Sequence, residues 1–201
     1  YRSSRGLGDV YKRQIITDEG DPYNEILFKK SINNIKSKNI FSTVESKVYD
    51  GSTPQQKKID IIVEEKPTGE VSAGAGTGTS GTTVSFSIAE NNYVGQGTKL
   101  KANVAFSDNS ITGLFSYTDP NYNFLGNSIN YSLSNESSDK PDLGYENSVI
   151  SAGSGTSFEQ YKDVRVRLGA SASHDDLRTD SSASSSLKQQ AGTYNEIATN
   201  Y

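Results

Sequence analysis

The chain of 201 residues contains no cysteine, methionine or tryptophan, and its only histidine is His174. Without cysteine there is no disulfide framework and no thiolate chemistry. A single histidine argues against a His-built metal site or a catalytic triad. The sequence also lacks any run of about 18 apolar residues, so it encodes no transmembrane helix. That absence does not exclude a membrane, because a barrel strand spans one with about 9–11 residues and leaves a weaker pattern.

The chain is also poor in hydrophobic residues and has a small net negative charge. Hydrophobic residues make up 32% of it, against about 45–50% in an average globular protein. Such polarity is typical of disorder, but 12 tyrosines, 7 phenylalanines and regular alternation indicate ordered strands. The net charge of −4 argues against nucleic acid as a partner.

The first residues differ in character from the rest. Residues 1–14, "YRSSRGLGDVYKRQ", show no usable periodicity and resemble adapter-derived read-through, although a basic flexible tail would look similar. We interpret them as a non-native segment and leave them out of the fold prediction. We expect the remainder to be a fragment of a longer protein.

A helix is expected in the next segment. Phe28, Ile32 and Ile35 are spaced to form one apolar face. Asp21 is the expected N-cap, and Pro22 suits the first helical position because its missing N–H is not needed there.

Two strands are expected after this helix, over residues 41–49 and 57–66. Turn formers fill the connection between them, and Pro67 ends the second strand. Residues 15–67 therefore form a small α/β unit with one helix face to bury on a small sheet.

From residue 68 onward the chain alternates apolar and polar residues in short runs, the signature of an antiparallel meander. Compact turns alternate with longer connections, and we expect loops at 137–144 and 175–192 and a turn at 158–163. The expected strands cover 69–78, 82–90, 98–106, 111–117, 127–138, 145–156, 163–174 and 193–201, and the facing of the sixth is not fixed by its pattern.

The apolar stripe of these strands could meet a second sheet in a soluble sandwich, or lipid in a barrel. Strand lengths near ten residues, and short turns on one side with longer loops on the other, favour the barrel. In that case the lipid-facing residues are Val84, Phe86, Ile88, Leu100, Val104, Phe106, Ile111, Phe115, Tyr117, Ile129, Tyr131, Leu133, Val164, Val166 and Leu168. The lumen-facing residues are Lys99, Lys101, Asn103, Arg165 and Arg167.

The sequence contains "VEEKPTGE", a glycine-rich strand and "ENNYVGQG" in succession, and further on "FSYTDPNY" and "DSSASSSLKQQAGTY". Through these motifs, of which the first group is the most specific, residues 15–201 resemble the BamA-type outer-membrane assembly factors. The resemblance implies a mainly β fold: the C-terminal part of a periplasmic POTRA module (15–67), followed by an open, curved antiparallel meander (68–201). That meander would be about half of a sixteen-stranded transmembrane barrel.

The resemblance also implies a function, the assembly and insertion of β-barrel proteins into the outer membrane of Gram-negative bacteria. The implied partners are nascent outer-membrane proteins, outer-membrane lipids and the lipoproteins of an assembly complex. The N-terminal part would lie in the periplasm. A polypeptide-secreting barrel of the same superfamily and a soluble or surface β-rich binding protein are the alternatives.

The first barrel strand is the expected site of this function. Glycine in a strand offers no side chain to pack, so the strand is only weakly attached to its neighbour. Its backbone N–H and C=O groups can then pair with a client strand. The residues in this lateral-gate hypothesis are Glu70, Val71, Ser72, Ala73, Gly74, Ala75, Gly76, Thr77 and Gly78. A merely flexible first hairpin is the alternative interpretation.

No catalytic set is visible, so we predict no enzyme activity, no cofactor and no metal. "GAGTGTSG" lacks the helix and the "GK[ST]" of a phosphate loop. "HDDLRTD" groups carboxylates that suit a hard cation, but we favour a solvated extracellular loop.

Overall fold

The computed structural model describes residues 10, 12, 14–17, 19–53, 56–78, 81–123, 125–162 and 164–201. The described part divides into two compact units. One comprises residues up to Thr68 together with Asn91–Thr98, and the other comprises Gly69–Glu90 and Lys99–Tyr201. Residues 1–14, which the sequence pattern excluded from the fold, lie mostly outside the described part; Val10, however, is buried at 5% exposure.

The first unit contains helix α2 (Glu25–Ser37) and the antiparallel strands β1 (Phe41–Asp50) and β2 (Lys57–Glu65). The apolar face expected for the helix is confirmed, since Phe28, Ile32 and Ile35 are buried. Val10, Ile40 and Phe41 complete the core cluster, and Val44, Ile59, Ile61 and Val63 of the hairpin pack against it.

The cap of α2 differs from the expectation. Asn24, not Asp21, is the N-cap: its Oδ1 accepts hydrogen bonds from the backbone N–H groups of Ile26 at 2.9 Å and Leu27 at 3.1 Å. Both residue types are good caps, so residue preference could not separate them. The helix starts three residues later than Pro22 because Asn24 has the extended backbone of a cap residue, with φ −128° and ψ 113°.

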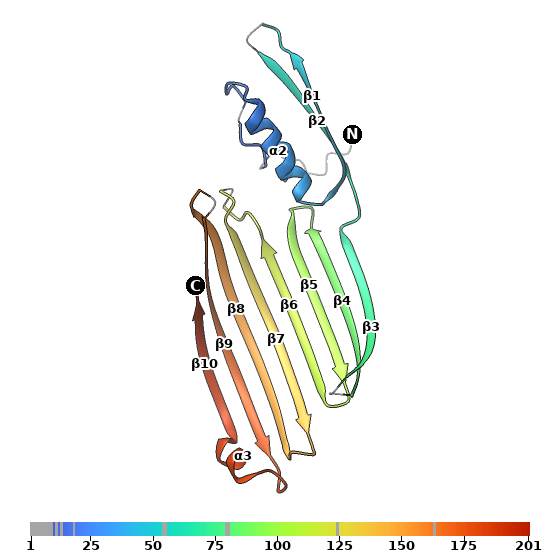
Figure 1. The fold of residues 1–201 in the computed structure, drawn as a ribbon, viewed down its shortest axis with the longest axis vertical. Helices are drawn as coiled ribbons and strands as arrows, with labels where there is room; N and C mark the ends of the chain where they lie inside the picture. The colour runs from blue at the N-terminus through green and yellow to red at the C-terminus, as the bar shows by residue number, and fades with distance from the viewer. Residues whose placement is uncertain are drawn as a thin grey trace. The chain divides into compact units, whose positions relative to one another are not determined.

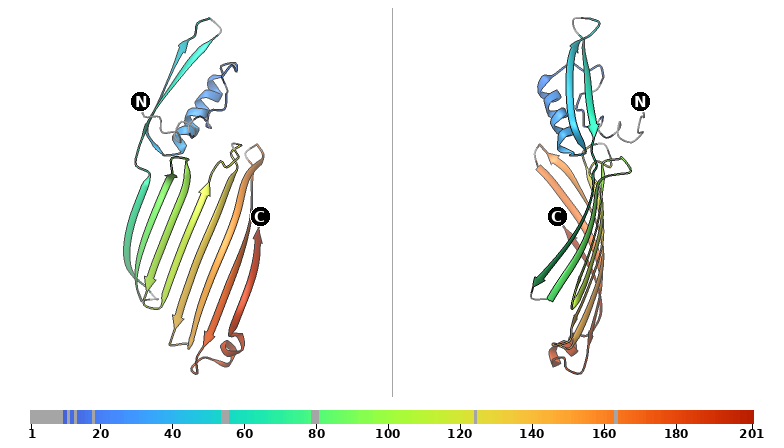
Figure 2. Two further views of the ribbon diagram at one scale, coloured as in Figure 1. Left: turned by 180° about the vertical axis from the view of Figure 1, so that it is seen from behind. Right: turned by 90° about the vertical axis from the view of Figure 1, so that its right-hand side faces the viewer.

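The second unit holds an eight-stranded antiparallel sheet in which each strand pairs with its sequence neighbours, in the order β10-β9-β8-β7-β6-β5-β4-β3. Figures 1 and 2 show these strands side by side in one curved layer. The strands are β3 (Gly69–Gly78), β4 (Gly81–Tyr93), β5 (Thr98–Ser107), β6 (Ser110–Asp119), β7 (Ser128–Lys140), β8 (Tyr145–Tyr161), β9 (Val164–Thr179) and β10 (Gly192–Asn200). The expected open meander of about seven or eight strands is therefore confirmed.

Several strands, β4 and β6 among them, are longer than expected, and the loop predictions around β7, β8 and β9 were wrong. β7 runs to Lys140, β8 continues through the expected turn at 158–163 to Tyr161, and β9 continues to Thr179. The polar ends of these strands pair with each other: Lys140 lies opposite Tyr145, and Tyr145 opposite Thr179. Cross-strand hydrogen bonds thus extend the strands where the apolar alternation has already ended.

The connection after β9 also differs from the expected loop, because it contains helix α3 (Ser185–Gln190). The Asp180 carboxylate accepts hydrogen bonds from the N–H and hydroxyl of Ser182, which hold the pKa of Asp180 below its usual value. The Asp180 N–H donates to the carbonyl of Gly144 at 2.9 Å, and Ala183 is buried. The connection is thereby fastened to the turn between β7 and β8.

Two of the hairpin turns are closed by the same kind of side-chain hydrogen bond. The Asn92 side chain accepts a hydrogen bond from the Gly97 N–H at 2.7 Å, and the Asn121 side chain accepts one from the Gly126 N–H at 2.6 Å. Both glycines have positive φ, 71° and 78°, a conformation that glycine adopts at little cost. The pattern Asn-Tyr-x-x-x-Gly therefore builds both turns.

Candidate functional site at the first strand of the sheet

Strand β3 is an edge strand of the described sheet and pairs there with β4 alone. The bounds predicted from its glycine pattern, 69–78, are confirmed. All ten of its residues are exposed. An edge strand presents a row of backbone N–H and C=O groups that have no ladder partner, and these groups can pair with another chain.

Side chains add little to the attachment of β3. Val71 lies opposite Ile88 in the ladder but remains 79% exposed. A Cβ added at Gly76 or Gly78 would meet nothing within 4 Å, so crowding does not require glycine at these positions. Because these glycines have no side chain to pack, the strand is held mainly by its backbone hydrogen bonds to β4.

The two faces of the sheet differ in chemistry. From β5 to β9 the register places the expected apolar residues on one side, which we name the apolar face: Leu100 lies opposite Tyr117, and Tyr117 opposite Tyr131. In the β3–β4 pair, Val84, Phe86 and Ile88 share one side with Val71, Ala73 and Ala75. The expected apolar residues from β5 to β9 on this face are Leu100, Val104, Phe106, Ile111, Phe115, Tyr117, Ile129, Tyr131, Leu133, Val164, Val166 and Leu168.

The described chain leaves this apolar face largely uncovered. Phe106 is 45% exposed and Phe115 is 44% exposed, and Leu133 reaches 52%. In a soluble sandwich these side chains would be buried under a second sheet. Exposure of so many large apolar side chains on one surface is typical of a surface that contacts a partner or a membrane.

The opposite, polar face carries the residues expected to line a lumen. Lys99, Lys101 and Asn103 lie opposite Thr118, Ser116 and Leu114 in the register. Arg165 and Arg167 lie opposite Glu159 and Ser157. The side chain of Asn103 donates to the Phe86 carbonyl at 3.3 Å, so it links β5 to β4 as well as facing this side.

The strand register also resolves the facing of β8, which the sequence left open. Ile150, Ala152 and Phe158 of β8 belong to the apolar face, because they pair with His174, Ala172 and Val166. Small residues carry most of the opposite side of this strand, including Ser151, Gly153, Gly155 and Ser157. The glycines and serines explain why the pattern was weak: both faces of β8 are partly made of small residues.

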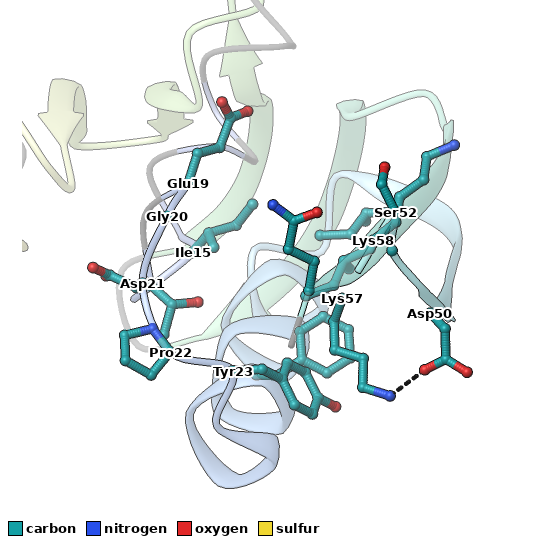
Figure 3. Close-up of a pocket in the computed structure, with 16 residues that line it drawn as sticks. Ile15, Glu19, Gly20, Asp21, Pro22, Tyr23, Asp50, Ser52, Lys57 and Lys58 are labelled. Atoms are coloured by element: carbon teal, nitrogen blue, oxygen red, sulfur yellow. Dashed lines mark hydrogen bonds and ion pairs between the residues drawn. The ribbon is translucent and has the colours of Figure 1, made fainter. Parts of the chain in front are cut away.

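A separate hollow of about 1200 Å³ lies in the α/β unit, between the start of α2 and the tip of the β1–β2 hairpin. Figure 3 shows Tyr23 and Lys57 on its sides, and Lys57 forms an ion pair with Asp50. This pair holds the pKa of Asp50 below its usual value. Apolar Phe28, Ile59 and Ile61 form part of its lining.

Neither a metal cluster nor a membrane-spanning helix is found in the described part. Its residues contain no group of three or more His, Cys, Asp or Glu side chains able to hold a metal ion. None of its helices is long and apolar enough to cross a membrane. The "HDDLRT" residues lie in β9, where His174 Nδ1 is 2.8 Å from Asn195 Oδ1 and Arg178 pairs with Asp176.

The single-layer meander, polar on one face and apolar on the other, is the architecture of a β-barrel wall. The family comparison agrees: residues 92–201 match the Omp85 superfamily domain. This chain belongs to the Omp85 superfamily.

Two relatives show how the chain compares with studied proteins. It is 23% identical over 173 residues to the outer membrane protein assembly factor BamA of Neisseria meningitidis serogroup B, which covers 83% of this chain and 22% of that protein. Its fold is similar to the crystal structure of BamA from Haemophilus ducreyi lacking POTRA domains 1–3, with a TM-score of 0.76 and 20% identity. That match covers 97% of this chain and 40% of the other.

These similarities confirm the predicted resemblance to BamA-type proteins, and they concern only part of each relative. The chain spans less than half the length of either one. The Neisseria meningitidis relative is named as an assembly factor. The prediction that this chain is not an enzyme is confirmed at the level of the family.

Proposed function

We propose that the chain is part of an outer-membrane β-barrel that assembles and inserts other barrel proteins. The sheet would form part of the barrel wall, with its apolar face toward lipid and its polar face toward the lumen. The α/β unit would lie in the periplasm. The uncovered apolar face supports the membrane location, since Phe86 and Ile88 are each 53% exposed on a single-layer sheet.

The observation that carries the assembly role is the open edge of β3. Its residues form ten consecutive positions of an extended strand that is paired on one side only, in the described sheet. A client strand could add to the free side through main-chain hydrogen bonds, and this requires no particular client sequence. Such pairing suits a factor that must accept many different nascent outer-membrane proteins.

Further partners belong to the same proposal. The lipids of the outer membrane would contact the apolar face, and assembly-complex lipoproteins would associate with the periplasmic part. The name of the Neisseria relative supports the assembly role for that protein; for this chain the role, its clients and these lipoproteins are part of the proposal.

Site-specific photo-crosslinking tests the proposed pairing. A photo-reactive residue at Ser72 or Ala75 of β3 should give adducts with a barrel protein during its assembly. The matched control is Ser132 in β7, a strand that is paired on both sides and whose Ser132 side chain lies on the polar face.

The pattern of adducts distinguishes the proposed role from its alternative. Adducts from Ser72 and Ala75 but not from Ser132 would support strand pairing at the edge. Adducts from Ser132 alone would indicate a polypeptide passing along the polar face, as in a secretion barrel. Absence of adducts from β3 in an active protein would refute the template role.

A further inference from the structure

The β3–β4 hairpin is fastened to the rest of the sheet at the end where Gly78 lies opposite Gly81. The Asp108 carboxylate, in the two-residue turn between β5 and β6, accepts a hydrogen bond from the Thr82 N–H at 3.1 Å. The two residues are 26 positions apart in sequence. Hydrogen bonds to ionised acceptors are stronger than those between neutral groups.

The same turn also contacts β7. The carbonyl of Asn109 accepts a hydrogen bond from the Asp139 N–H of β7 at 2.8 Å. The turn of Asp108 and Asn109 therefore contacts β4 through a side chain and β7 through its backbone. It joins the first hairpin to strands that are themselves paired on both sides in the described sheet.

Gly81 makes this contact possible. Its φ of +88° lies in the region that favours glycine, and an added Cβ would lie 2.0 Å from Asp108 Oδ2. Any side chain at position 81 would displace the carboxylate from the Thr82 N–H. The close approach of Gly81 and Asp108 is thus part of the same contact.

We propose that Asp108 is a positioning residue that keeps β3 ordered as a template. β3 contributes little side-chain packing, so its order depends on β4. β4 also pairs with β5, and Asp108 adds a further contact at the Gly81 end of β4. A strand held extended before binding loses less conformational entropy when a partner pairs with it. This inference deepens the proposed function and rests on it for the role of the free edge.

Hydrogen exchange of the full-length protein in lipid nanodiscs tests the positioning role without any client. Asp108→Ala should speed exchange of the Thr82 amide and of the ladder amides near Gly78 by about tenfold, as expected for the loss of one hydrogen bond to a charged group. Amides near Gly69, at the other end of the hairpin, should change little. Asp108→Asn keeps an oxygen acceptor and should restore most of the protection.

Two further variants separate this contact from general effects. Asp139→Ala removes the same charge at the same end of the sheet from an exposed side chain, and should leave exchange at Thr82 unchanged. Gly81→Ala should speed exchange as Asp108→Ala does, and the double variant should add little, because both changes break one contact. Unchanged exchange at Thr82 in Asp108→Ala, or equal acceleration in Asp139→Ala, would overturn the assignment.

Client crosslinking then tests the consequence for pairing. In Asp108→Ala, adduct yield from Ala75 should fall several-fold while the yield from Ser72, farther from the contact, is retained. Faster exchange with unchanged yield at Ala75 would overturn the template role of Asp108. If the wild-type protein gives no adducts at all, the proposed function fails, and the exchange data still decide whether Asp108 orders the hairpin.

Discussion

Replacing Phe115 by arginine tests which face of the sheet meets lipid. Phe115 is the sixth of ten residues of β6 and lies between Ala102 and Leu133 on the apolar face. In the proposed barrel this position is near the bilayer midplane, where arginine costs about 2–4 kcal/mol. That cost corresponds to a loss of about thirty- to several-hundred-fold in the folding equilibrium.

The neighbouring residue provides a matched control. Ser116 lies opposite Lys101 and Ser132 on the polar face, so Ser116→Arg places the same charge at nearly the same depth toward the proposed lumen. Its expected cost is below about 1 kcal/mol, because a lumen substitution keeps the guanidinium in water. Ile111→Arg, near the end of the strand, should cost less than Phe115→Arg since the penalty falls toward the interface.

Urea titration of the full-length protein refolded into lipid vesicles measures these free energies, and heat-modifiable migration reports the folded fraction. Equal costs at positions 115 and 116, or a larger cost at 116, would refute the facing. Recovery of the unmodified protein in the soluble fraction, with the Phe115 side chain protected by a second layer of protein, would refute the membrane location itself.

Three further predictions concern local structure outside the sheet faces. Ile35→Ala should destabilise the α/β unit by about 2–5 kcal/mol, because the side chain is fully buried. Ile26→Ala, where the side chain is 78% exposed, should have little effect. Urea titration followed by hydrogen exchange in α2 measures the stability of both variants. Gly144→Ala should loosen the connection after β9, since φ is +70° and a Cβ would lie 2.6 Å from the Ala183 nitrogen; faster proteolysis within residues 181–184 is the expected sign. The salt bridge with Lys29 lowers the pKa of Glu25. The contribution of this salt bridge to helix stability should therefore be present above pH 4.5 and disappear as the pH falls through the lowered pKa. A Glu25→Gln variant whose hydrogen exchange in α2 keeps the same pH dependence would contradict this.

Local pattern was sufficient for several elements. The alternation of Leu100, Val104 and Phe106 predicted both the strand and the side that these residues share. The spacing of Phe28 and Ile35 predicted the buried face of α2. In each case the preference is repeated over several residues, so the sequence pattern and the packing agree.

Local pattern was insufficient where a single residue or a single strand pairing determines the structure. Asn24 and Asp21 are both good caps, and only the backbone path selects Asn24. Residues 175–179 have the polar composition of a loop, yet they form a strand because the end of β8 provides hydrogen-bonding partners. The pattern assigned Asp108 only to a turn, and its bond to Thr82 depends on bringing together residues far apart in the chain.

The sequence by itself determined the type of most helices and strands and the two-sided chemistry of the strands, because a period of two over many residues fixes which side chains share a face. Its short motifs carried the resemblance to the family. Tertiary structure decided the strand ends, the facing of β8 and the attachment of the first hairpin. These depend on which strand lies alongside another, and hydrogen bonds between distant segments set that arrangement.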